Sequence, residues 1–498
     1  MGLVQKASIK ITVVSYLGIA LGYFNRVLLF TNFLLPDQVG LIAILTSIGI
    51  FYAQFGIMGM STVSVRFFPY FQDKERQHHG FFFWGNCIIT IGFIITTILF
   101  VLLKPAVIHY YQKSSPLLID FYYYIIPLAL GLLYFQFLES YLRSLLKTVI
   151  STIAYELIGR LLVTITLLLY ILKWINFHEF VLLYVLGNCV IALILLFYVA
   201  FLKHLFLRPV ITPRLLRLIK IIAVYGFFTI LSALGGQILA IIDGLIVAAK
   251  LNLTQEGIYS TVFLMTTVML LPYRSIQKIA HPLLPRFWKE RNMTAMAELY
   301  SKTTLTDMIF GGFLFLLLWI NIFSIFRFMP KEYYSAKYVF LLLAIARYVD
   351  MATGINGYII LTSKKYRFDL WCMLFLIALT IVLNLVFIPK YNILGSAIAT
   401  LISISLYNIL RVIFVWYFYR MQPFTKNCLW VFIITIAVWI IAAQLPDIHD
   451  KYLDIAIKST LLAILYFVPV LLFKLSGDVN RLVYSVTKLK YLKPKDAR

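Results

Sequence analysis

The chain has 498 residues, of which 62% are hydrophobic and only 13% are charged. Ordinary soluble domains are about 45–50% apolar and about 25% charged, so this composition excludes a soluble globular protein. The formal net charge is +24. A nucleic-acid-binding protein would carry such an excess on a solvated face. Here the basic residues separate long apolar runs, which indicates a polytopic membrane protein with no nucleic-acid partner.

Apolar runs long enough to cross a bilayer, roughly 20 residues each, recur along the whole chain. We predict an all-α protein with about fourteen transmembrane helices. The first run is too long, and too closely followed by a second, to be a cleaved signal peptide. The predicted spans are 11–35, 39–62, 81–103, 117–138, 149–172, 178–202, 219–249, 257–276, 305–329, 338–361, 368–388, 394–418, 428–445 and 455–473.

Lysine and arginine in the loops set the orientation of such a protein, because the basic loops stay on the cytoplasmic side. One alternate set of connecting segments, together with both chain ends, holds most of the basic residues. We therefore predict a multi-pass protein of the cell (inner) membrane with both termini cytoplasmic.

A shift of 217 residues aligns the two halves of the chain. It maps Leu28, Leu34, Gln38 and Gly40 onto Leu245, Leu251, Gln255 and Gly257. An even number of helices per repeat gives both copies the same orientation, so the copies should be related by an axis along the membrane normal. We predict an N-terminal six-helix lobe (1–202), a basic cytoplasmic linker (203–220), a C-terminal six-helix lobe (221–420), and two additional helices with a basic cytoplasmic tail (421–498).

The sequence offers no catalytic constellation, metal site or cofactor motif. A phosphate-cradling Gly-Lys-Ser/Thr loop is absent from the sequence. We expect Asp447, Asp450 and Asp454 to form a solvated acidic loop, and His78 and His79 to lie at the surface. The cysteines, with unrelated spacings within apolar runs, should be small buried hydrophobic residues: Cys87, Cys189, Cys372 and Cys428.

Charged residues inside predicted spans need a partner or a function, because each costs roughly 2.5–3.5 kcal/mol near the bilayer centre. Glu156 and Arg160 are four residues apart and can neutralise each other on one helix face. Arg411 lies in the cytoplasmic part of its span and can extend its charge to the interface.

Arg347 and Asp350 are three residues apart and can also pair. Asn356 adds polarity to the same helix. This helix is either structural or lines a cavity, with a role in gating or ion coupling.

Arg26 and Asp243 occupy equivalent positions on the first helix of each predicted lobe, since they are 217 residues apart. They should approach each other near the pseudo-twofold axis. One interpretation is an inter-lobe charge pair that an anionic substrate or a proton breaks. The other is a permanent tether between the lobes.

Arg66 and Arg274 end comparable helices of the two predicted lobes, and Lys278 follows Arg274 by one turn. They are either ordinary cytoplasmic anchors or a ring of cations. The planar guanidinium group suits phosphate oxygens in particular. Together with Arg26 and the adjacent Asn25, they are the candidate substrate-binding residues.

Three stretches resemble the polysaccharide exporters of the MOP superfamily, the Wzx-type oligosaccharide-lipid flippases, which are related to the lipid II flippase and the MATE exporters. The stretches are N-R-V-L-L-F-T-N-F-L-L-P-D-Q-V-G-L-I-A-I with F-G-I-M-G-M-S-T-V-S-V-R-F-F-P, then I-D-G-L-I-V-A-A-K-L-N-L-T-Q-E-G-I-Y-S, then P-K-Y-N-I-L-G-S-A-I-A-T-L-I-S. The resemblance covers the order of helices over nearly the whole chain. Fourteen helices fit the polysaccharide branch better than the twelve-helix drug exporters.

The resemblance implies a non-enzymatic flippase that moves polyprenyl-pyrophosphate-linked oligosaccharide across the membrane by alternating access, for cell-surface polysaccharide such as O-antigen (lipopolysaccharide) or capsule. It also implies a cationic cavity to which Arg26, Arg66 and Arg274 contribute. Possible partners are a polysaccharide polymerase and glycosyltransferases. The alternatives are a MATE-like cation-coupled drug exporter, which needs an acidic cavity, and a membrane glycosyltransferase or polymerase, which the short outer loops disfavour.

Overall fold

A computed structural model describes residues 2–210 and 213–481 of the chain. The residues within these ranges form helices joined by short connections, without any strand. The chain divides into two compact units, Met1–Ser260 (unit 1) and Thr261–Arg498 (unit 2). The boundary thus follows the seventh predicted span, whereas the repeat in the sequence suggests a boundary at the linker 203–220.

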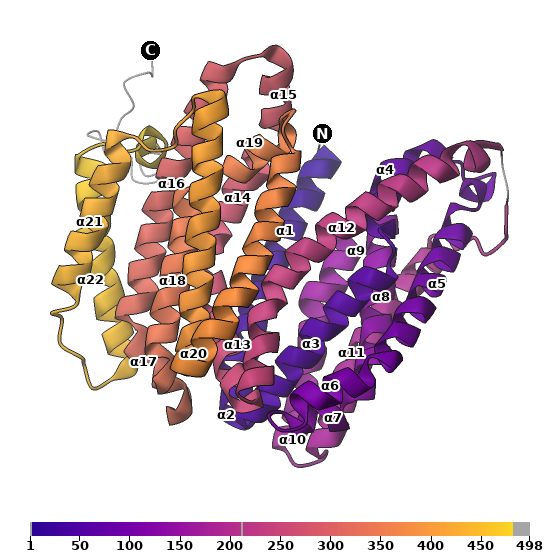
Figure 1. Cartoon of the computed structure of the whole chain (residues 1–498), viewed down its shortest axis with the longest axis horizontal. Coiled ribbons are helices and arrows are strands. Elements are labelled where there is room, and N and C mark those ends of the chain that lie inside the picture. Colours follow the sequence, from indigo (N-terminus) through magenta and orange to yellow (C-terminus); the bar gives the residue numbers. More distant parts are fainter. Residues whose placement is uncertain (1, 211–212, 482–498) are drawn as a thin grey trace. The chain divides into compact units, whose positions relative to one another are not determined.

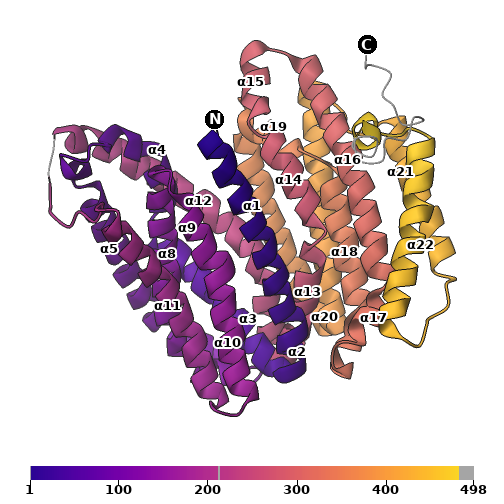
Figure 2. The same ribbon diagram turned by 180° about the vertical axis from the view of Figure 1, so that it is seen from behind.

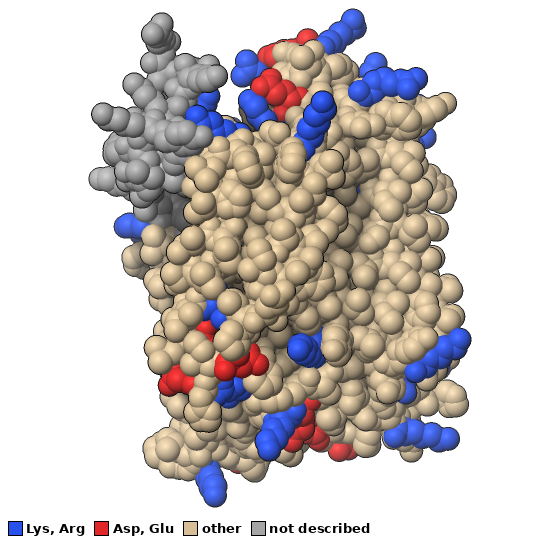
Figure 3. All heavy atoms as spheres, turned by 90° about the vertical axis from the view of Figure 1, so that its left-hand side faces the viewer, with Lys and Arg blue, Asp and Glu red and all other residues tan. Residues whose placement is uncertain are grey.

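Within the described ranges, ten helices are long and apolar enough to cross a bilayer, and a bent pair of helices can form an eleventh span. Figure 3 views unit 2 from the side on which its last two helices lie. Lys, Arg, Asp and Glu lie toward the two ends of this face, and a broad band of other residues separates them. This distribution suits a bilayer core, which excludes charge. The predicted all-α polytopic membrane fold is confirmed.

In unit 1, α8 packs against α3, α4 and α11, and α12 packs against α3 and α4 (Figure 1). Two π-helical turns, η1 (Phe24–Leu29) and η4 (Ile153–Ile158), interrupt the helices near α1 and α10. The helices of unit 1 are α1 (Gly2–Tyr23), α2 (Phe30–Phe33), α3 (Pro36–Gly56), α4 (Met60–Phe71), α5 (Phe81–Leu102), α6 (Lys104–Tyr111), α7 (Pro116–Asp120), α8 (Ile125–Ser144), α9 (Thr148–Thr152), α10 (Gly159–Ile171), α11 (Phe177–Phe201) and α12 (Pro213–Lys250), followed by the first part of α13 (Leu253–Thr267).

In unit 2, α16 packs against α18 and α21, and α18 packs against α20; Figure 2 shows α21 and α22 side by side next to α16. The helices of this unit are the end of α13, then α14 (Leu270–Ala280), α15 (Leu283–Glu290), α16 (Met293–Ile320), α17 (Ile322–Phe326), α18 (Lys337–Ala352), α19 (Asn356–Thr362), α20 (Arg367–Tyr419), α21 (Lys426–Ala442) and α22 (Lys451–Leu472). Residues 482–498, the end of the predicted basic tail, lie outside the described residues.

The fourteen predicted spans are compatible with these helices, although several boundaries differ. Helix α20 covers two predicted spans, which a break at Asn392 (φ 53°, ψ −137°) separates. The span predicted at 338–361 is broken between α18 and α19, where Gly354 has φ +63° and the axes bend by 49°. Helix α16 begins twelve residues before its predicted span, because polar residues alternate there with buried Met296 and Tyr300 and so lower the local hydropathy.

Two glycines related by the 217-residue shift meet within unit 1. Gly40 of α3 lies against the backbone of Leu253 and Gly257 in α13, and Gly257 lies against Pro36 and Gly40. A Cβ atom at either position would collide with the backbone of the other helix. The two glycines therefore permit a helix crossing that no larger residue allows, as small residues do in other membrane helix pairs.

The expectation that His78 and His79 lie at the surface is wrong, since both are buried. The connection before α5 folds onto the segment after α11, where Nε2 of His78 and Nδ1 of His204 are 2.9 Å apart and the two rings stack. The Asp73 backbone N–H donates to Nδ1 of His78, so His78 donates from Nε2 to His204.

The expected solvated acidic loop is also wrong in part. Asp454 is fully buried, and Lys458 lies 3.0 Å from its carboxylate and 2.6 Å from that of Asp447. The Ser324 hydroxyl donates to Asp454, which joins α22 to α17. Asp450 caps α22 by accepting from the N–H groups of Tyr452 and Leu453.

The predicted burial of the cysteines holds for Cys372 and Cys428, whereas Cys87 and Cys189 are half-buried.

Candidate functional site

A polar pocket of about 340 Å³ lies among α4, α8 and α12 of unit 1. Two arginines, one glutamate, three hydroxyl groups of serine or threonine, a glutamine and a tyrosine line it: Ser61, Thr62, Arg66, Gln136, Glu139, Ser140, Arg143 and Tyr225. The pocket thus holds one more positive than negative side chain. Such a set of donors suits an anion with several oxygens.

Arg66 is positioned in this pocket by aromatic rings. Its guanidinium carbon lies 4.3 Å from the ring centre of Tyr225 on α12 and 5.6 Å from that of Phe67. Within the described ranges, no ion pair joins Arg66 to a carboxylate. A cation–π contact leaves the five N–H donors of the guanidinium group available for phosphate oxygens.

Arg143 differs from Arg66, because it pairs with Glu139 one turn earlier on α8. Both side chains of this pair are partly exposed, so it contributes little to stability. An anion with higher charge density than a carboxylate can therefore compete with Glu139 for Arg143 at low cost. The sequence did not single out Arg143, because a basic residue at the end of a span is the ordinary topology signal.

Arg26 occupies the π-helical turn η1, between α1 and α2. Its Nη2 is 3.5 Å from the hydroxyl groups of Thr46 and Tyr184, which are 3.0 Å from each other. These distances are at the outer limit of hydrogen bonding, so the guanidinium is weakly held. π-Helical turns are frequent at functional sites, because the extra residue re-aims a side chain.

Asn25, the neighbour of Arg26, uses its amide to join η1 to α10. It donates to the Arg160 carbonyl at 2.9 Å and accepts from the Thr164 hydroxyl at 2.9 Å. The predicted pair of Glu156 and Arg160 is confirmed, with 2.7 Å between the charged atoms. Gly18 and Gly22 of α1 lie directly against these two side chains, and a larger residue would collide with them.

Two buried carboxylates come together at the end of unit 1. Asp243 of α12 accepts a hydrogen bond from the Tyr259 hydroxyl at 3.2 Å, and Glu256 of α13 lies against Gly244. Glu256 is within electrostatic range of both Asp243 and Arg26. Among the described residues, Oε2 of Glu256 has no hydrogen-bond partner. Glu256 was not predicted as a site residue, because it lies just before the predicted span 257–276, where an acidic residue resembles an ordinary loop residue.

In unit 2, Asp350, Thr353 and Asn356 converge on Asn408 of α20. Asn408 donates to Asp350 at 3.0 Å and accepts from Thr353 at 2.9 Å and from Asn356 at 3.4 Å. The Arg347 guanidinium carbon lies 4.7 Å from the ring centre of Phe263. The break between α18 and α19 places these polar groups together inside the unit.

Asp307 of α16 is fully buried and lies within electrostatic range of Asp350. Neither of its carboxylate oxygens has a hydrogen-bond partner among the described residues. Asp307 was not singled out from the sequence, although it lies within the predicted span 305–329, because an acidic residue so close to the end of a span resembles an ordinary interfacial residue. Its burial makes this cluster a candidate ion- or proton-binding site.

The expectation that Arg411 extends to the membrane interface is wrong. Its guanidinium pairs with Asp369, lies 4.0 Å from the Tyr407 ring centre, and packs against Gly357. Its side chain is 14% exposed. The pairing follows from the break in α20, which brings the start of this helix back to its second half.

Arg274 and Lys278 lie one turn apart on α14 of unit 2 and are both exposed. The predicted ring of cations would join Arg274 and Lys278 to Arg66 of unit 1, and this ring stays a prediction. Within the described ranges, no group of three or more His, Cys, Asp or Glu side chains is arranged to hold a metal ion.

Comparisons by sequence give no relative: no family model and no curated protein matches the chain. Its fold, in contrast, is similar to known transporters. Superposition on the lipid II flippase MurJ in an inward closed conformation gives a TM-score of 0.74 at 14% identity, covering 92% of this chain and 98% of that one.

An inward-facing multidrug resistance MATE family transporter of the MOP superfamily gives a TM-score of 0.62 at 13% identity, covering 85% of this chain and 94% of that one. A MOP superfamily transporter from Pyrococcus furiosus gives 0.52 at 15% identity, covering 83% and 96%. The chain therefore has the fold that MurJ and the MATE transporters share.

Proposed function

We propose that the protein is a flippase that moves polyprenyl-pyrophosphate-linked oligosaccharide across the cytoplasmic membrane, for the synthesis of a cell-surface polysaccharide. The single observation that carries this proposal is the polar pocket of unit 1, in which Arg66 is held by Tyr225 with its donors available. A pyrophosphate group offers charge and oxygens to both Arg66 and Arg143, and sugar hydroxyls suit the neighbouring serine, threonine and glutamine side chains.

The mechanism is alternating access. The pyrophosphate enters from the cytoplasmic leaflet and binds the arginines of unit 1, while the polyprenyl tail remains in the bilayer. Arg26, loosely held by Thr46 and Tyr184, is available to the anion once the head group moves inward. Arg274 and Lys278 of unit 2 complete the cationic path in this proposal. Release on the other side follows when the cytoplasmic side closes.

The buried carboxylates suit ion or proton coupling of this movement. Glu256 and Asp307 each have at least one carboxylate oxygen that accepts no hydrogen bond from the described residues. A buried carboxylate in this condition is costly and binds a cation or a proton readily. Asp243, Asp350 and Asn356 contribute neighbouring oxygens. Gating or coupling by these residues is part of the proposal.

The second candidate function is a cation-coupled exporter of organic cations. The same carboxylates favour it, because their negative charge attracts a cationic drug. The arginines of the unit 1 pocket oppose it, since they would repel such a cargo. A membrane glycosyltransferase or polymerase is the weakest alternative; such enzymes fit better as partners that supply or consume the lipid-linked sugar.

The test is transport by the purified protein in proteoliposomes. One arm uses a fluorescent polyprenyl-pyrophosphate oligosaccharide, the second its monophosphate analogue, and the third a cationic dye. We expect flipping of the pyrophosphate lipid. In Arg66→Ala, the rate should fall about tenfold or more, because charge-assisted hydrogen bonds contribute about 1.5–3 kcal/mol. The matched control is Arg76→Ala, which removes an arginine that is exposed in the connection after α4.

Three results would contradict the proposal. Transport of the dye without transport of either lipid would favour the drug exporter. Sugar transfer by the purified protein would identify an enzyme. Equal flipping by Arg66→Ala and Arg76→Ala would remove the unit 1 pocket from the path of the head group.

A further inference from the structure

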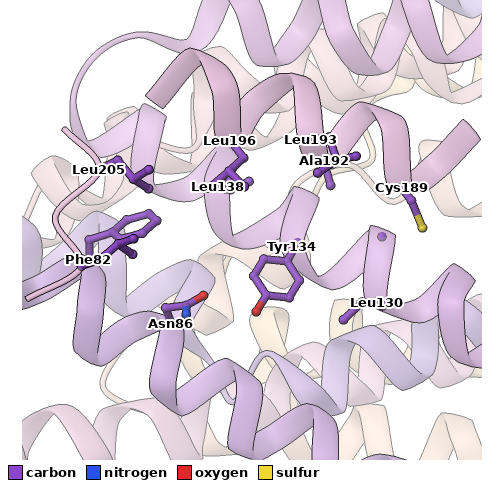
Figure 4. A pocket seen from close by; sticks show the side chains of 12 residues that line it. Phe82, Asn86, Leu130, Tyr134, Leu138, Cys189, Ala192, Leu193, Leu196 and Leu205 are labelled. Carbon is purple, nitrogen blue, oxygen red and sulfur yellow. The ribbon is translucent and has the colours of Figure 1, made fainter. Parts of the chain in front are cut away.

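A second, apolar cavity of about 450 Å³ lies on another side of unit 1, among α5, α8, α11 and the segment 202–210 (Figure 4). Phe82 and Leu205 lie at one end of it in this view, Leu138 and Leu196 lie near its middle, and Leu130 and Cys189 lie toward the other end. Its volume is in the range of pockets that take small organic ligands.

This cavity faces away from the polar pocket, although α8 lines both. The polar pocket uses Gln136, Glu139, Ser140 and Arg143, whereas the apolar cavity uses Leu130, Gly131, Tyr134 and Leu138. At 3.6 residues per turn, these two sets lie on opposite faces of α8. The apolar cavity is thus separate from the site proposed for the pyrophosphate.

The rim of the cavity belongs to an apolar outer surface. Leu193 on α11 and Leu207 in the segment 202–210 both line the cavity and are 49% and 58% exposed. The outward face of α11 continues this surface with exposed Leu186, Val190 and Phe197, which lie on the same side of the helix as Leu193. In a membrane-spanning chain, such a surface contacts acyl chains, so the occupant of the cavity is available from the bilayer itself.

Basic residues lie at one end of the cavity. Leu205 and Leu207 come from a segment in which Lys203 and Arg208 are exposed. Lys74 and Lys147 are within electrostatic range of His204 in the same segment. The acidic residues nearby are Asp73 and Glu75, and Asp73 already contacts Arg76. The net charge at this end is therefore positive, which suits a phosphate group.

Polar groups also lie at the depth expected for the esters of a phospholipid. Helix α5 begins at Phe81, so Asn86 is about 7.5 Å along its axis from that end. Figure 4 shows the side chains of Asn86 and Tyr134 beside the cavity. Thr90 and Tyr134 share a hydrogen bond of 3.2 Å. The Asn86 amide can donate to an ester carbonyl group at this position. The Tyr134 hydroxyl donates to Thr90, whose own hydroxyl donates to the Asn86 backbone carbonyl.

We propose that this cavity binds one acyl chain of an anionic phospholipid, whose phosphate group lies at Lys203 and Arg208. The site is distinct from the path of the transported lipid and does not depend on the proposed function. A lipid bound here connects α5 and α11 to the segment that leads from unit 1's first six spans into α12.

The test uses Cys189, which lines the cavity, as a reporter. In a Cys87→Ser background, Cys189 is the remaining half-buried cysteine, since Cys372 and Cys428 are buried. The labelling rate of Cys189 by an apolar maleimide is measured in detergent with added phosphatidylglycerol or phosphatidylcholine. We expect stronger protection by phosphatidylglycerol. Removing either Lys203 or Arg208 should weaken that preference about fivefold, since a basic residue near an anionic lipid contributes about 1 kcal/mol.

Matched variants distinguish lipid binding in the cavity from a general effect of a substitution on the fold. Ala192→Phe fills the cavity and should abolish protection, whereas Ala200→Phe, at an exposed position on the same helix, should not. Lys173→Ala removes an exposed lysine outside the site and should leave the lipid preference unchanged. Should Ala192→Phe fail to fold, a photoactivatable acyl chain on phosphatidylglycerol provides a second measurement, with cross-links expected on α5 and α11.

Equal protection by the two phospholipids, or a preference that survives Lys203→Ala with Arg208→Ala, would overturn the proposal. Protection by polyprenyl phosphate but not by phosphatidylglycerol would overturn it as well, and would assign the cavity to the tail of the transported lipid.

Discussion

The polar interiors of the two sequence repeats differ in the sign of the charge that is left available. In the first repeat, Glu156 is neutralised by Arg160, while Arg66 has aromatic contacts and Arg26 has long hydroxyl contacts. In the second repeat, Arg411 is bound to Asp369, while Asp307 keeps two carboxylate oxygens without a hydrogen-bond partner among the described residues. The difference suggests that the first repeat binds an anion and the second repeat binds a cation or a proton.

Arg411 gives the largest expected effect, because it is buried and paired. Removing one partner of a buried ion pair costs about 3–5 kcal/mol. We therefore expect Arg411→Ala to lower the melting temperature strongly, as followed by tryptophan fluorescence in detergent. Arg66→Ala should leave the melting temperature nearly unchanged. Equal stability of the two variants would mean that the pairing with Asp369 does not hold Arg411 more firmly than the aromatic contacts hold Arg66.

Asp307 tests whether the second repeat binds a cation or a proton. An unsatisfied buried polar group costs about 1–3 kcal/mol, so Asp307→Asn should not lower stability. We expect this variant to lose the dependence of lipid flipping on an ion or proton gradient, measured in proteoliposomes with and without the gradient. A strong loss of stability with unchanged coupling would show that Asp307 is structural.

Tyr225 tests how Arg66 is held. A cation–π contact contributes about 0.5–2 kcal/mol, so Tyr225→Leu should reduce lipid flipping less than Arg66→Ala does. Tyr225→Phe keeps the ring and should retain most of the activity. An equal loss in Tyr225→Phe and Tyr225→Leu would assign the effect to the hydroxyl group, which both variants lack, instead of the ring.

His204 gives the smallest expected effect. Burial lowers its pKa below the usual 6.5, and the nearby Lys74 and Lys147 lower it further. The unfolded chain then binds a proton more readily than the folded chain, so stability should decrease as the pH falls below about 6.5. His204→Gln should weaken this dependence in thermal unfolding, whereas His109→Gln, at an exposed position, should not. An unchanged pH profile in His204→Gln would contradict this assignment.

The sequence predicted those features that depend on local spacing. Apolar runs predicted the membrane spans, because a helix needs about 20 mostly apolar residues to cross the bilayer. The four-residue spacing predicted the pair of Glu156 and Arg160. The 217-residue shift paired Gly40 with Gly257. Their contact in unit 1 was not predicted, because it depends on how α3 and α13 pack against each other.

Features that depend on contacts between distant segments were not predictable in this way. Arg411 meets Asp369 across 42 residues, because α20 breaks at Asn392. His78 is buried by a segment 126 residues later. Glu256 and Asp307 were missed because acidic residues near the ends of predicted spans resemble ordinary interfacial residues.

The central claim is that the first repeat recognises a pyrophosphate head group through Arg66. The most direct measurement is the affinity of the purified protein for a short-chain polyprenyl pyrophosphate and for the corresponding monophosphate. We predict at least about tenfold tighter binding of the pyrophosphate, from one further charge-assisted contact, and loss of this preference in Arg66→Ala. Equal affinity for the two lipids in the unmodified protein, or a preference that Arg66→Ala retains, would contradict the claim.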